Sequence, residues 1–192
     1  TYSVVPDQIE AGTFMLAAVA TKGDITVKNC IPEHLDCLTA KLIEMGVNVD
    51  INNDSIRVCT NKRPNKANII TMPYPGYPTD LQPQIGVVLS LAEGTSIWDS
   101  RFQYTAELNK MGAKIINQGK SAVFEGVEEL YGSFVEATDL RAGAALIIAG
   151  IVANGETSIT NIYHIDRGYE NIEDKFRKLG ANIQRVVEED IF

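Results

Sequence analysis

The amino-acid sequence repeats one pattern three times, and no other feature constrains the fold as strongly. In each copy an apolar stretch with helical spacing ends at a glycine, and an alternating run follows it. The three glycines are Gly46, Gly112 and Gly180, at intervals of 66 and 68 residues. A glycine commonly ends a helix, and an alternating run is typical of a strand. Because self-similarity at a fixed interval marks a recurring folding unit, we predict a threefold repeat of helix and strand.

Each copy also contains an earlier helix and an earlier strand. The earlier helices are predicted over residues 7–20, 80–92 and 139–153. Each begins at an aspartate, whose carboxylate can accept hydrogen bonds from the free amides of the first turn. A glycine turn and a β-rich run follow, and strand-like pieces at 55–60 and 121–125 complete a βαβαββ unit. The predicted repeats cover about residues 1–66, 67–132 and 133–192.

The segment 142–153 indicates where the helices lie in the fold, because it is almost entirely apolar. A helix that is apolar on all sides is buried on all sides. Three such helices related by a repeat favour an α/β fold with the helices inside and the sheets outside. Two or three ordinary α/β layers are the alternative architecture.

The charge balance argues against two classes of partner. The 192 residues include 17 lysines and arginines against 25 aspartates and glutamates, which gives a net charge of −8. Non-specific binding to nucleic acid or to an anionic membrane needs surplus positive charge, so we expect neither partner. No apolar run approaches the ~20 residues of a membrane-spanning helix.

The cysteines point to a reducing, cytoplasmic setting. Cys30, Cys37 and Cys59 are odd in number and lack CxxC spacing, which does not suit a disulfide framework. Only His34 lies near them, so no metal site is predicted. The chain also lacks the GxGxxG, P-loop, GxSxG and HExxH patterns, which weakens the case for a nicotinamide enzyme, a nucleotide hydrolase or a zinc protease.

Differences between the repeats identify candidate functional residues. Helix capping explains Asp7 and Asp139 well enough. Asp80 differs because it follows a rigid proline-rich loop at 73–78. A carboxylate held at that place could lie close to a substrate hydroxyl, as a general base must, although capping is the simpler interpretation.

Three arginines form a second group of candidates. Arg101 and Arg167 follow the β-rich runs of the second and third copies, whereas the first copy has no arginine there. A guanidinium near a helix start suits a carboxylate or a phosphate, although a surface salt bridge is the more usual role. Arg141 lies in the first turn of its helix, where a cation opposes the helix dipole, and this hints at an anionic ligand.

Four longer segments carry a resemblance to a known family. The segments are residues 6–14, 73–82, 137–146 and 162–170, which include PYPGYPTDLQ, ATDLRAGAAL and IYHIDRGYE. They closely resemble the UDP-N-acetylglucosamine enolpyruvyl transferases, members of the EPSP synthase-like family that catalyse the first committed step of bacterial peptidoglycan synthesis. The match runs in order from end to end of the chain.

The resemblance implies a fold and a place in a larger enzyme. Members of this family have two similar domains, each an inside-out α/β barrel of three βαβαββ units around buried helices. The chain resembles the C-terminal domain, so we expect it to be one half of a two-domain enzyme. The complementary N-terminal domain would carry the family's lysine and loop cysteine, whose motifs do not occur here. We therefore expect this chain to be inactive alone.

The resemblance also implies a reaction, in which the enolpyruvyl group of phosphoenolpyruvate passes to the 3′-hydroxyl of UDP-N-acetylglucosamine and phosphate is released. Asp80 matches the aspartate proposed as the base for that hydroxyl. Arg167 and Arg101 match arginines of the phosphoenolpyruvate site. An active-site strip of the family is matched by Asp139, Leu140 and Arg141. Ile97 matches a position whose backbone contacts the UDP-sugar. No metal or organic cofactor is implied.

Other functions are weighed against this one. The sister transferase acting on shikimate 3-phosphate shares the fold, but the motifs around Asp139 and Arg167 match the sugar-nucleotide enzyme better. A non-catalytic domain that binds a UDP-sugar or serves assembly is a second alternative, and the acidic charge disfavours an RNA 3′-phosphate cyclase. The sequence departs from the family pattern at a shortened segment between Gly94 and Arg101, and at Pro83.

Overall fold

The computed structural model describes residues 3–99 and 102–186. Helices and strands are interspersed along the chain, and 3-10 helices are denoted η. The first part contains α1 (Gln8–Ala20), β1 (Asp24–Lys28), η1 (Pro32–Leu35), α2 (Asp36–Glu44), β2 (Asn48–Ile51) and β3 (Ser55–Cys59). The middle part contains β4 (Asn68–Ile69), η2 (Thr79–Leu81), α3 (Gln82–Leu91), β5 (Thr95–Trp98), α4 (Thr105–Lys110), β6 (Lys114–Gln118) and β7 (Ser121–Glu125). The last part contains β8 (Phe134–Glu136), α5 (Leu140–Val152), β9 (Ser158–Thr160), η3 (Ile162–Arg167) and α6 (Ile172–Lys178).

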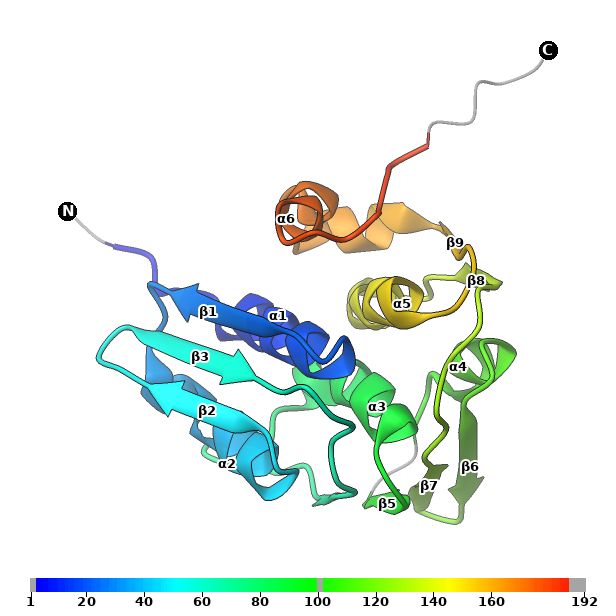
Figure 1. Ribbon diagram of the computed structural model, residues 1–192, viewed down its shortest axis with the longest axis horizontal. Helices are drawn as coiled ribbons and strands as arrows, with labels where there is room; N and C mark the ends of the chain where they lie inside the picture. Colours follow the sequence, from blue (N-terminus) through cyan, green and yellow to red (C-terminus); the bar gives the residue numbers. More distant parts are fainter. Residues whose placement is uncertain (1–2, 100–101, 187–192) are drawn as a thin grey trace.

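Helices α1, α3 and α5 lie at the centre of the molecule and pack against one another (Figure 1). Nearly every residue of α3 is buried, and so is α5 from Ala142 to Ala149. Small residues and branched aliphatic residues dominate these helices, which lets their backbones approach closely while apolar surface leaves water. The prediction of buried helices inside an α/β fold is therefore confirmed, and the alternative of ordinary layers is not.

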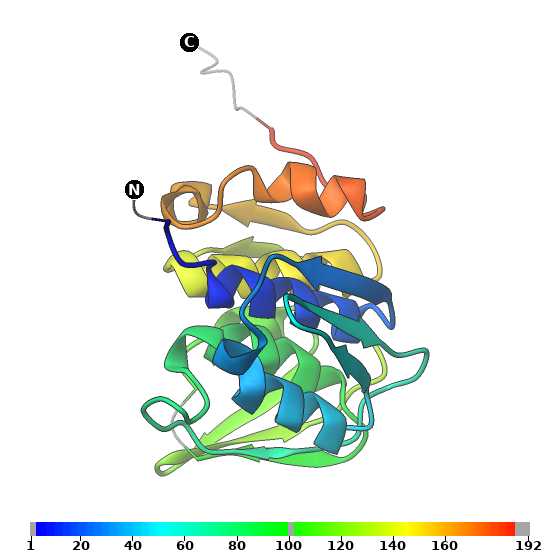
Figure 2. The ribbon, with the colours of Figure 1, turned by 90° about the vertical axis from the view of Figure 1, so that its left-hand side faces the viewer.

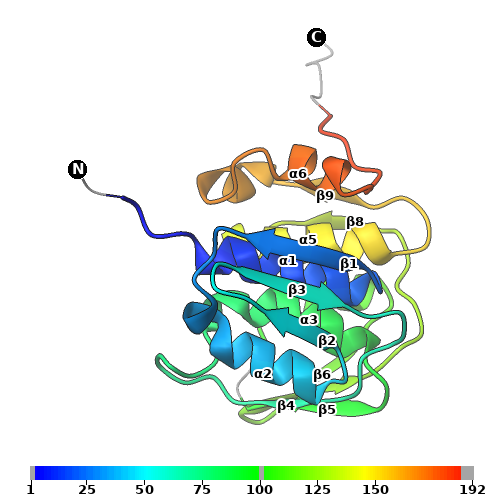
Figure 3. The ribbon, with the colours of Figure 1, turned by 60° about the vertical axis from the view of Figure 1, so that its left-hand side comes forward.

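The described strands form sheets outside these helices. Strands β1, β3 and β2 make an antiparallel sheet, and β4, β5, β7 and β6 make a second sheet in which β4 runs parallel to β5. Figure 2 shows η3 and α6 on one side of the core helices and the second sheet on the opposite side. Figure 3 shows the first sheet in front of α1 and α3. Strands β8 and β9 form a smaller parallel pair beside α5.

The glycines that end α2, α4 and α6 take the conformation that the repeat predicts. Gly46, Gly112 and Gly180 have φ values of +80°, +91° and +100°. A side chain is strained in this left-handed region, so glycine ends the helix at little cost. A strand follows the first two glycines, as predicted, but residues 181–186 form none. In the first two copies a following strand, β3 or β7, supplies the hydrogen-bonding partner, and the described part of the third copy contains no equivalent strand.

The predicted aspartate caps are confirmed at two of the three core helices. Oδ1 of Asp7 accepts hydrogen bonds from the amides of Ile9 at 2.7 Å and Glu10 at 3.3 Å. Oδ1 of Asp139 accepts from Arg141 at 2.8 Å and Ala142 at 2.9 Å. These bonds satisfy amides that have no partner within the helix.

Asp80 does not cap a helix, and this part of the prediction is wrong. The turn η2 precedes α3, so α3 begins two residues after Asp80, and its N-cap residue Leu81 makes no side-chain capping bond. Pro83 lies in the first turn of α3, where its missing N–H would have had no partner in the helix. The departure from the family pattern at Pro83 therefore fits the helix, and the Asp80 carboxylate is left for other interactions.

A cluster of aromatic rings joins the second sheet to α3. Phe102 is 1% exposed, and its ring meets that of Phe124 edge-on at 5.1 Å between centroids. The ring of Phe102 also lies over Gly86 of α3, where an added Cβ would stand 2.5 Å from Cζ. Only glycine leaves room for this contact, so Phe102 and Gly86 together set the distance between the helix and the sheet.

We expect the stability of the fold to fall at alkaline pH. Burial raises the pKa of Tyr77 and Tyr169 above the usual value of about 10. A raised folded pKa means that the unfolded chain loses its phenol protons first, so this contribution to stability is complete below pH ~10 and declines as pH rises further. Tyr77→Phe is expected to change the free energy of unfolding by no more than about 1 kcal/mol at neutral pH and to weaken the alkaline decline. Urea unfolding at neutral pH and above pH ~10, followed by fluorescence of the buried Trp98, checks this. An unchanged alkaline decline in the variant would contradict it.

Candidate functional site

An ion pair between Asp80 and Arg141 joins the starts of two core helices. Nη2 of Arg141 lies 2.6 Å from Oδ1 of Asp80, and the two side chains are 46% and 40% exposed. Asp80 comes from η2 at the end of the proline-rich loop, and Arg141 comes from the first turn of α5. Because α3 and α5 pack side by side, their N-terminal ends bring these residues together. The anion next to Arg141 is therefore a carboxylate of the protein itself.

Asp139 and Tyr104 lie next to this pair. The Asp139 carboxylate caps α5 and thereby holds the turn from which Arg141 projects. Burial raises the pKa of the Tyr104 phenol well above its usual value, and the Asp139 carboxylate beside it raises this pKa further. The charges of Arg141 and Asp80 also act on the phenol, in opposite directions. Four groups from α3, α4 and α5 and their flanking turns therefore share one electrostatic environment.

Leu140 contributes shape to the site. It is partly buried and packs against the core, and an added Cβ on Gly168 would lie 2.7 Å from its Cδ2. The contact holds the end of η3 close to the start of α5. Leu140 has no polar side-chain group with which to bind a charged substrate, so packing is its role in the described structure.

Arg167 lies at the end of η3, on the segment that packs against α5. Its Cζ lies 5.9 Å from the centre of the Tyr163 ring, in cation–π geometry. Within residues 3–99 and 102–186 its guanidinium forms no ion pair, so the surface salt bridge weighed above is not seen there. An exposed guanidinium steadied by an aromatic ring can donate to a carboxylate or a phosphate.

Ile97 and Arg101 belong to the second sheet and the segment after it. Ile97 lies in β5 with its side chain 43% exposed. Its backbone N–H donates to Oδ1 of Asn68 at 3.2 Å, so that amide is already engaged within the protein. Arg101, which the sequence places at the phosphoenolpyruvate site, lies outside the described residues.

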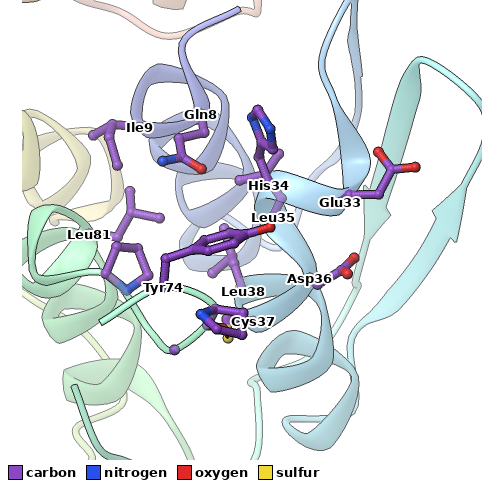
Figure 4. Close-up of a pocket in the computed structure, with 13 residues that line it drawn as sticks. Gln8, Ile9, Glu33, His34, Leu35, Asp36, Cys37, Leu38, Tyr74 and Leu81 are labelled. Atoms are coloured by element: carbon purple, nitrogen blue, oxygen red, sulfur yellow. Dashed lines mark hydrogen bonds between the residues drawn. The ribbon is translucent and has the colours of Figure 1, made fainter. Parts of the chain in front are cut away.

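A hollow of about 100 Å³ lies beside the Asp80 turn (Figure 4). Its walls are mostly apolar and include Ile9, Leu38 and Leu81, with Tyr74 lying across them. Glu33 and Asp36 belong to the lining but point away from Leu81 in Figure 4. The hollow takes residues from η2 without containing the Asp80–Arg141 pair, so it neighbours the site and is not part of it.

The side chains of the described segments offer no group of three or more histidine, cysteine, aspartate or glutamate residues that could hold a metal ion. The cysteines Cys30, Cys37 and Cys59 are all free thiols. Burial raises the pKa of Cys30, which makes its thiol less reactive. No helix in the described part of the chain is long and apolar enough to cross a membrane.

A buried polar group next to the site was not predicted from the sequence pattern. It consists of Thr13 of α1, Gln84 of α3 and Tyr169 after η3, which hydrogen-bond to one another. A signal was present, because Thr13 and Gln84 are polar residues within the mostly apolar, buried stretches of α1 and α3. The identity of their shared partner, Tyr169, depends on the tertiary fold.

Comparison with known proteins shows which family and which relatives the chain is similar to. Residues 1–176 match the family model described as EPSP synthase (3-phosphoshikimate 1-carboxyvinyltransferase). A curated relative from Clostridium botulinum, UDP-N-acetylglucosamine 1-carboxyvinyltransferase, is 54% identical over 191 residues, covering 97% of this chain and 46% of the relative. A relative of the same name from Desulfofundulus thermocisternus is 53% identical over 96% of this chain and 78% of its own length. The chain spans about half the length of the Clostridium botulinum relative and of two further relatives at 51% and 52% identity.

Solved structures place the fold in the same family. The enolpyruvyl transferase NikO from Streptomyces tendae superimposes with a TM-score of 0.85 at 26% identity, over 95% of this chain and 45% of that one. EPSP synthase from Acinetobacter baumannii superimposes with a TM-score of 0.77 at 19% identity, over 94% of this chain and 47% of that one. The second likeness concerns the fold alone, and it agrees with the first.

Proposed function

Because the chain belongs to the EPSP synthase family of enolpyruvyl transferases, we propose that it is the C-terminal domain of a two-domain UDP-N-acetylglucosamine 1-carboxyvinyltransferase. Two relatives that carry this name are 54% and 53% identical to the chain along nearly its whole length. We propose that residues 1–192 form a single domain built from repeats at about 1–66, 67–132 and 133–192. The complementary domain is the partner we expect, together with the two substrates.

In the proposed reaction the sugar 3′-hydroxyl oxygen attacks C2 of phosphoenolpyruvate, and C3 takes up a proton. The C2–O bond to phosphate then breaks, C3 loses a proton, and the enol ether and inorganic phosphate are the products. Such a reaction needs a group that accepts the hydroxyl proton and cations that bind the phosphoenolpyruvate charges. These steps would begin peptidoglycan synthesis, in the cytoplasm, and so serve cell-wall growth, cell shape and division.

The observation that carries this proposal is the position of the Asp80 carboxylate, which does not cap α3. Its equivalents Asp7 and Asp139 both bind helix amides, whereas Asp80 is kept away from the helix start by η2. The proposed role of Asp80 is to bind the 3′-hydroxyl and accept its proton. Arg141, 2.6 Å from Asp80, would orient the carboxylate and meet the anionic substrate. Arg167 and Arg101 would bind the phosphoenolpyruvate carboxylate. Asp139 and Leu140 would shape the substrate site, and Ile97 would contact the sugar nucleotide.

Binding of UDP-N-acetylglucosamine to the 192-residue chain tests the proposal. Titration followed by backbone amide NMR is expected to shift signals around Asp80 and Ile97. Asp80→Ala is expected to weaken binding by about 10- to 100-fold, because it removes a hydrogen bond to a charged group worth about 1.5–3 kcal/mol. Asp7→Ala removes the equivalent carboxylate of the first repeat and should leave the affinity unchanged. Equal weakening by both variants would contradict a special role for Asp80.

The same titration separates the second candidate function. The matched family model names 3-phosphoshikimate 1-carboxyvinyltransferase, which makes shikimate 3-phosphate the natural competitor. We expect shikimate 3-phosphate to leave the UDP-N-acetylglucosamine shifts unchanged at equal concentration. Displacement of the sugar nucleotide by shikimate 3-phosphate would favour the sister enzyme. If neither ligand binds until the complementary domain is added, the cleft requires both domains.

A further inference from the structure

Three polar side chains meet inside the apolar core, close to the proposed active site. Thr13 and Gln84 have no exposed surface, and Tyr169 is 4% exposed. The hydroxyl oxygens of Thr13 and Tyr169 are 2.9 Å apart. Nε2 of Gln84 donates to the Thr13 hydroxyl at 3.2 Å and to the Tyr169 hydroxyl at 3.4 Å. The three residues come from α1, α3 and the segment after η3, so the group ties together distant parts of the chain.

The direction of these hydrogen bonds follows from the donors available. The single hydroxyl proton of Thr13 is donated to the carbonyl of Ile9 at 2.8 Å. Thr13 must therefore act as acceptor toward the Tyr169 hydroxyl, and Tyr169 donates. The Tyr169 oxygen in turn accepts from Gln84. Each of the three side chains thus bonds to both of the others, and exchanging any one for an apolar group removes two of the three bonds.

Stability alone is a poor explanation for this group. Burying three polar side chains is costly, and matched apolar side chains would pack as well without that cost. Hydrogen bonds differ from apolar contacts because they require particular distances and angles. Such a group restrains the segment after η3 to one position against α1 and α3, whereas apolar packing alone would tolerate small shifts.

The restrained segment is the one that carries Arg167. Tyr169 follows Arg167 by two residues, and Gln84 lies one helical turn after Asp80. On the other side of Arg167, Ile165 is buried against Gly143 of α5, where an added Cβ would stand 2.4 Å from its Cγ1. The backbone of Arg167 is thus held at both sides, by an apolar contact before it and by hydrogen bonds after it. Its guanidinium remains exposed.

We infer that Thr13, Gln84 and Tyr169 are positioning residues that hold the backbone of Arg167 at a fixed place relative to the helix carrying Asp80. The inference rests on the proposed function for its kinetic consequence, because Arg167 is there assigned to phosphoenolpyruvate. The group touches neither substrate. The group acts on the reaction through the segment that carries Arg167. Its removal therefore affects phosphoenolpyruvate and spares UDP-N-acetylglucosamine.

Steady-state kinetics of the two-domain enzyme test this inference through matched substitutions. Tyr169→Phe removes one hydroxyl and keeps the ring, while Thr13→Val removes the shared acceptor with little change in shape. A small misplacement of a binding group can cost up to about 100-fold. We expect both variants to lower kcat/KM for phosphoenolpyruvate by about 10- to 100-fold and to leave the Kd of UDP-N-acetylglucosamine within about twofold. Thr13→Ser, which keeps the hydroxyl, should restore most of kcat/KM.

Two controls separate positioning from general loss of structure. Tyr131→Phe makes the same chemical change at an exposed tyrosine whose hydroxyl donates to Glu129 at 2.7 Å, and should change no kinetic constant. In Arg167→Ala, adding Tyr169→Phe should cause little further loss, because the group being positioned is gone. Fully additive losses in that double variant, or equal losses for both substrates, would overturn the inference.

The activity of the unmodified enzyme distinguishes failure of the proposed function from failure of the inference alone. If the unmodified two-domain enzyme does not convert phosphoenolpyruvate and UDP-N-acetylglucosamine, the proposed function fails and the inference falls with it. If the unmodified enzyme is active and Tyr169→Phe and Thr13→Val both keep kcat/KM for phosphoenolpyruvate within about twofold, only the inference fails.

Discussion

Replacing Asp80 with asparagine is expected to lower kcat of the two-domain enzyme by about 10²- to 10⁴-fold, the usual contribution of a general base. Asparagine keeps the size of the side chain and its hydrogen-bonding reach, but it cannot take the proton of the 3′-hydroxyl. The ion pair with Arg141 is lost at the same time. Turnover measured at saturating concentrations of both substrates gives the effect on kcat directly.

Asp7→Asn is the matched control for this experiment, because Asp7 stands at the equivalent place in the first repeat. Its carboxylate caps α1, and asparagine is an equally good capping residue. The control is therefore expected to keep both stability and kcat. A loss in Asp80→Asn of less than tenfold would contradict the assignment of Asp80 as the base and would leave it a binding residue at most.

Replacing Phe102 with alanine is expected to destabilise the folded chain by about 3–5 kcal/mol, as is typical when a large aromatic residue is removed from a packed core. The ring is buried against Phe124 and Gly86, and its loss opens a cavity between α3 and the second sheet. For a chain of this size, such a loss corresponds to a fall in melting temperature of roughly 6–20 °C. Urea unfolding followed by Trp98 fluorescence measures it, since Trp98 is the single tryptophan and is fully buried.

The control for that measurement is Phe134→Ala, in which the same ring is lost from a position that is 72% exposed in β8. Little apolar surface is buried there, so we expect a change within about 0.5 kcal/mol. If both variants lose similar stability, the cluster around Phe102 does not set the contact between α3 and the sheet. A Phe102→Ala chain that fails to fold while Phe134→Ala folds normally would agree with the prediction.

Local sequence signals predicted the helices well. The apolar stretches became the buried helices α1, α3 and α5, because a helix without a polar face has no stable position at the surface. Asp7 and Asp139 became helix caps, and Gly46, Gly112 and Gly180 took positive φ, since both effects act within a few residues of the chain. The family resemblance, supported by long motifs, pointed to the fold that the comparisons confirm.

The same local signals misled at two places. Like the other two aspartates, Asp80 precedes an apolar helical stretch, but it lies within η2, so α3 begins only after it. The strand expected after Gly180 is absent from residues 181–186, because a strand depends on a partner and not on its own alternation. In both cases the outcome depended on neighbouring structure that a short stretch of sequence does not contain.

The sequence by itself therefore determined the buried character of α1, α3 and α5, the aspartate caps of α1 and α5, the glycines that end α2, α4 and α6, and the residues that match the family's site. Tertiary structure alone decided which of those residues meet. Asp80 and Arg141 are separated by 61 positions and touch only because α3 and α5 pack side by side. Tyr169 reaches Thr13 across 156 positions through the core. Contacts at such separations arise when whole helices bury their apolar faces together, and hydrogen bonds and ion pairs then form between the polar groups that this packing brings within reach.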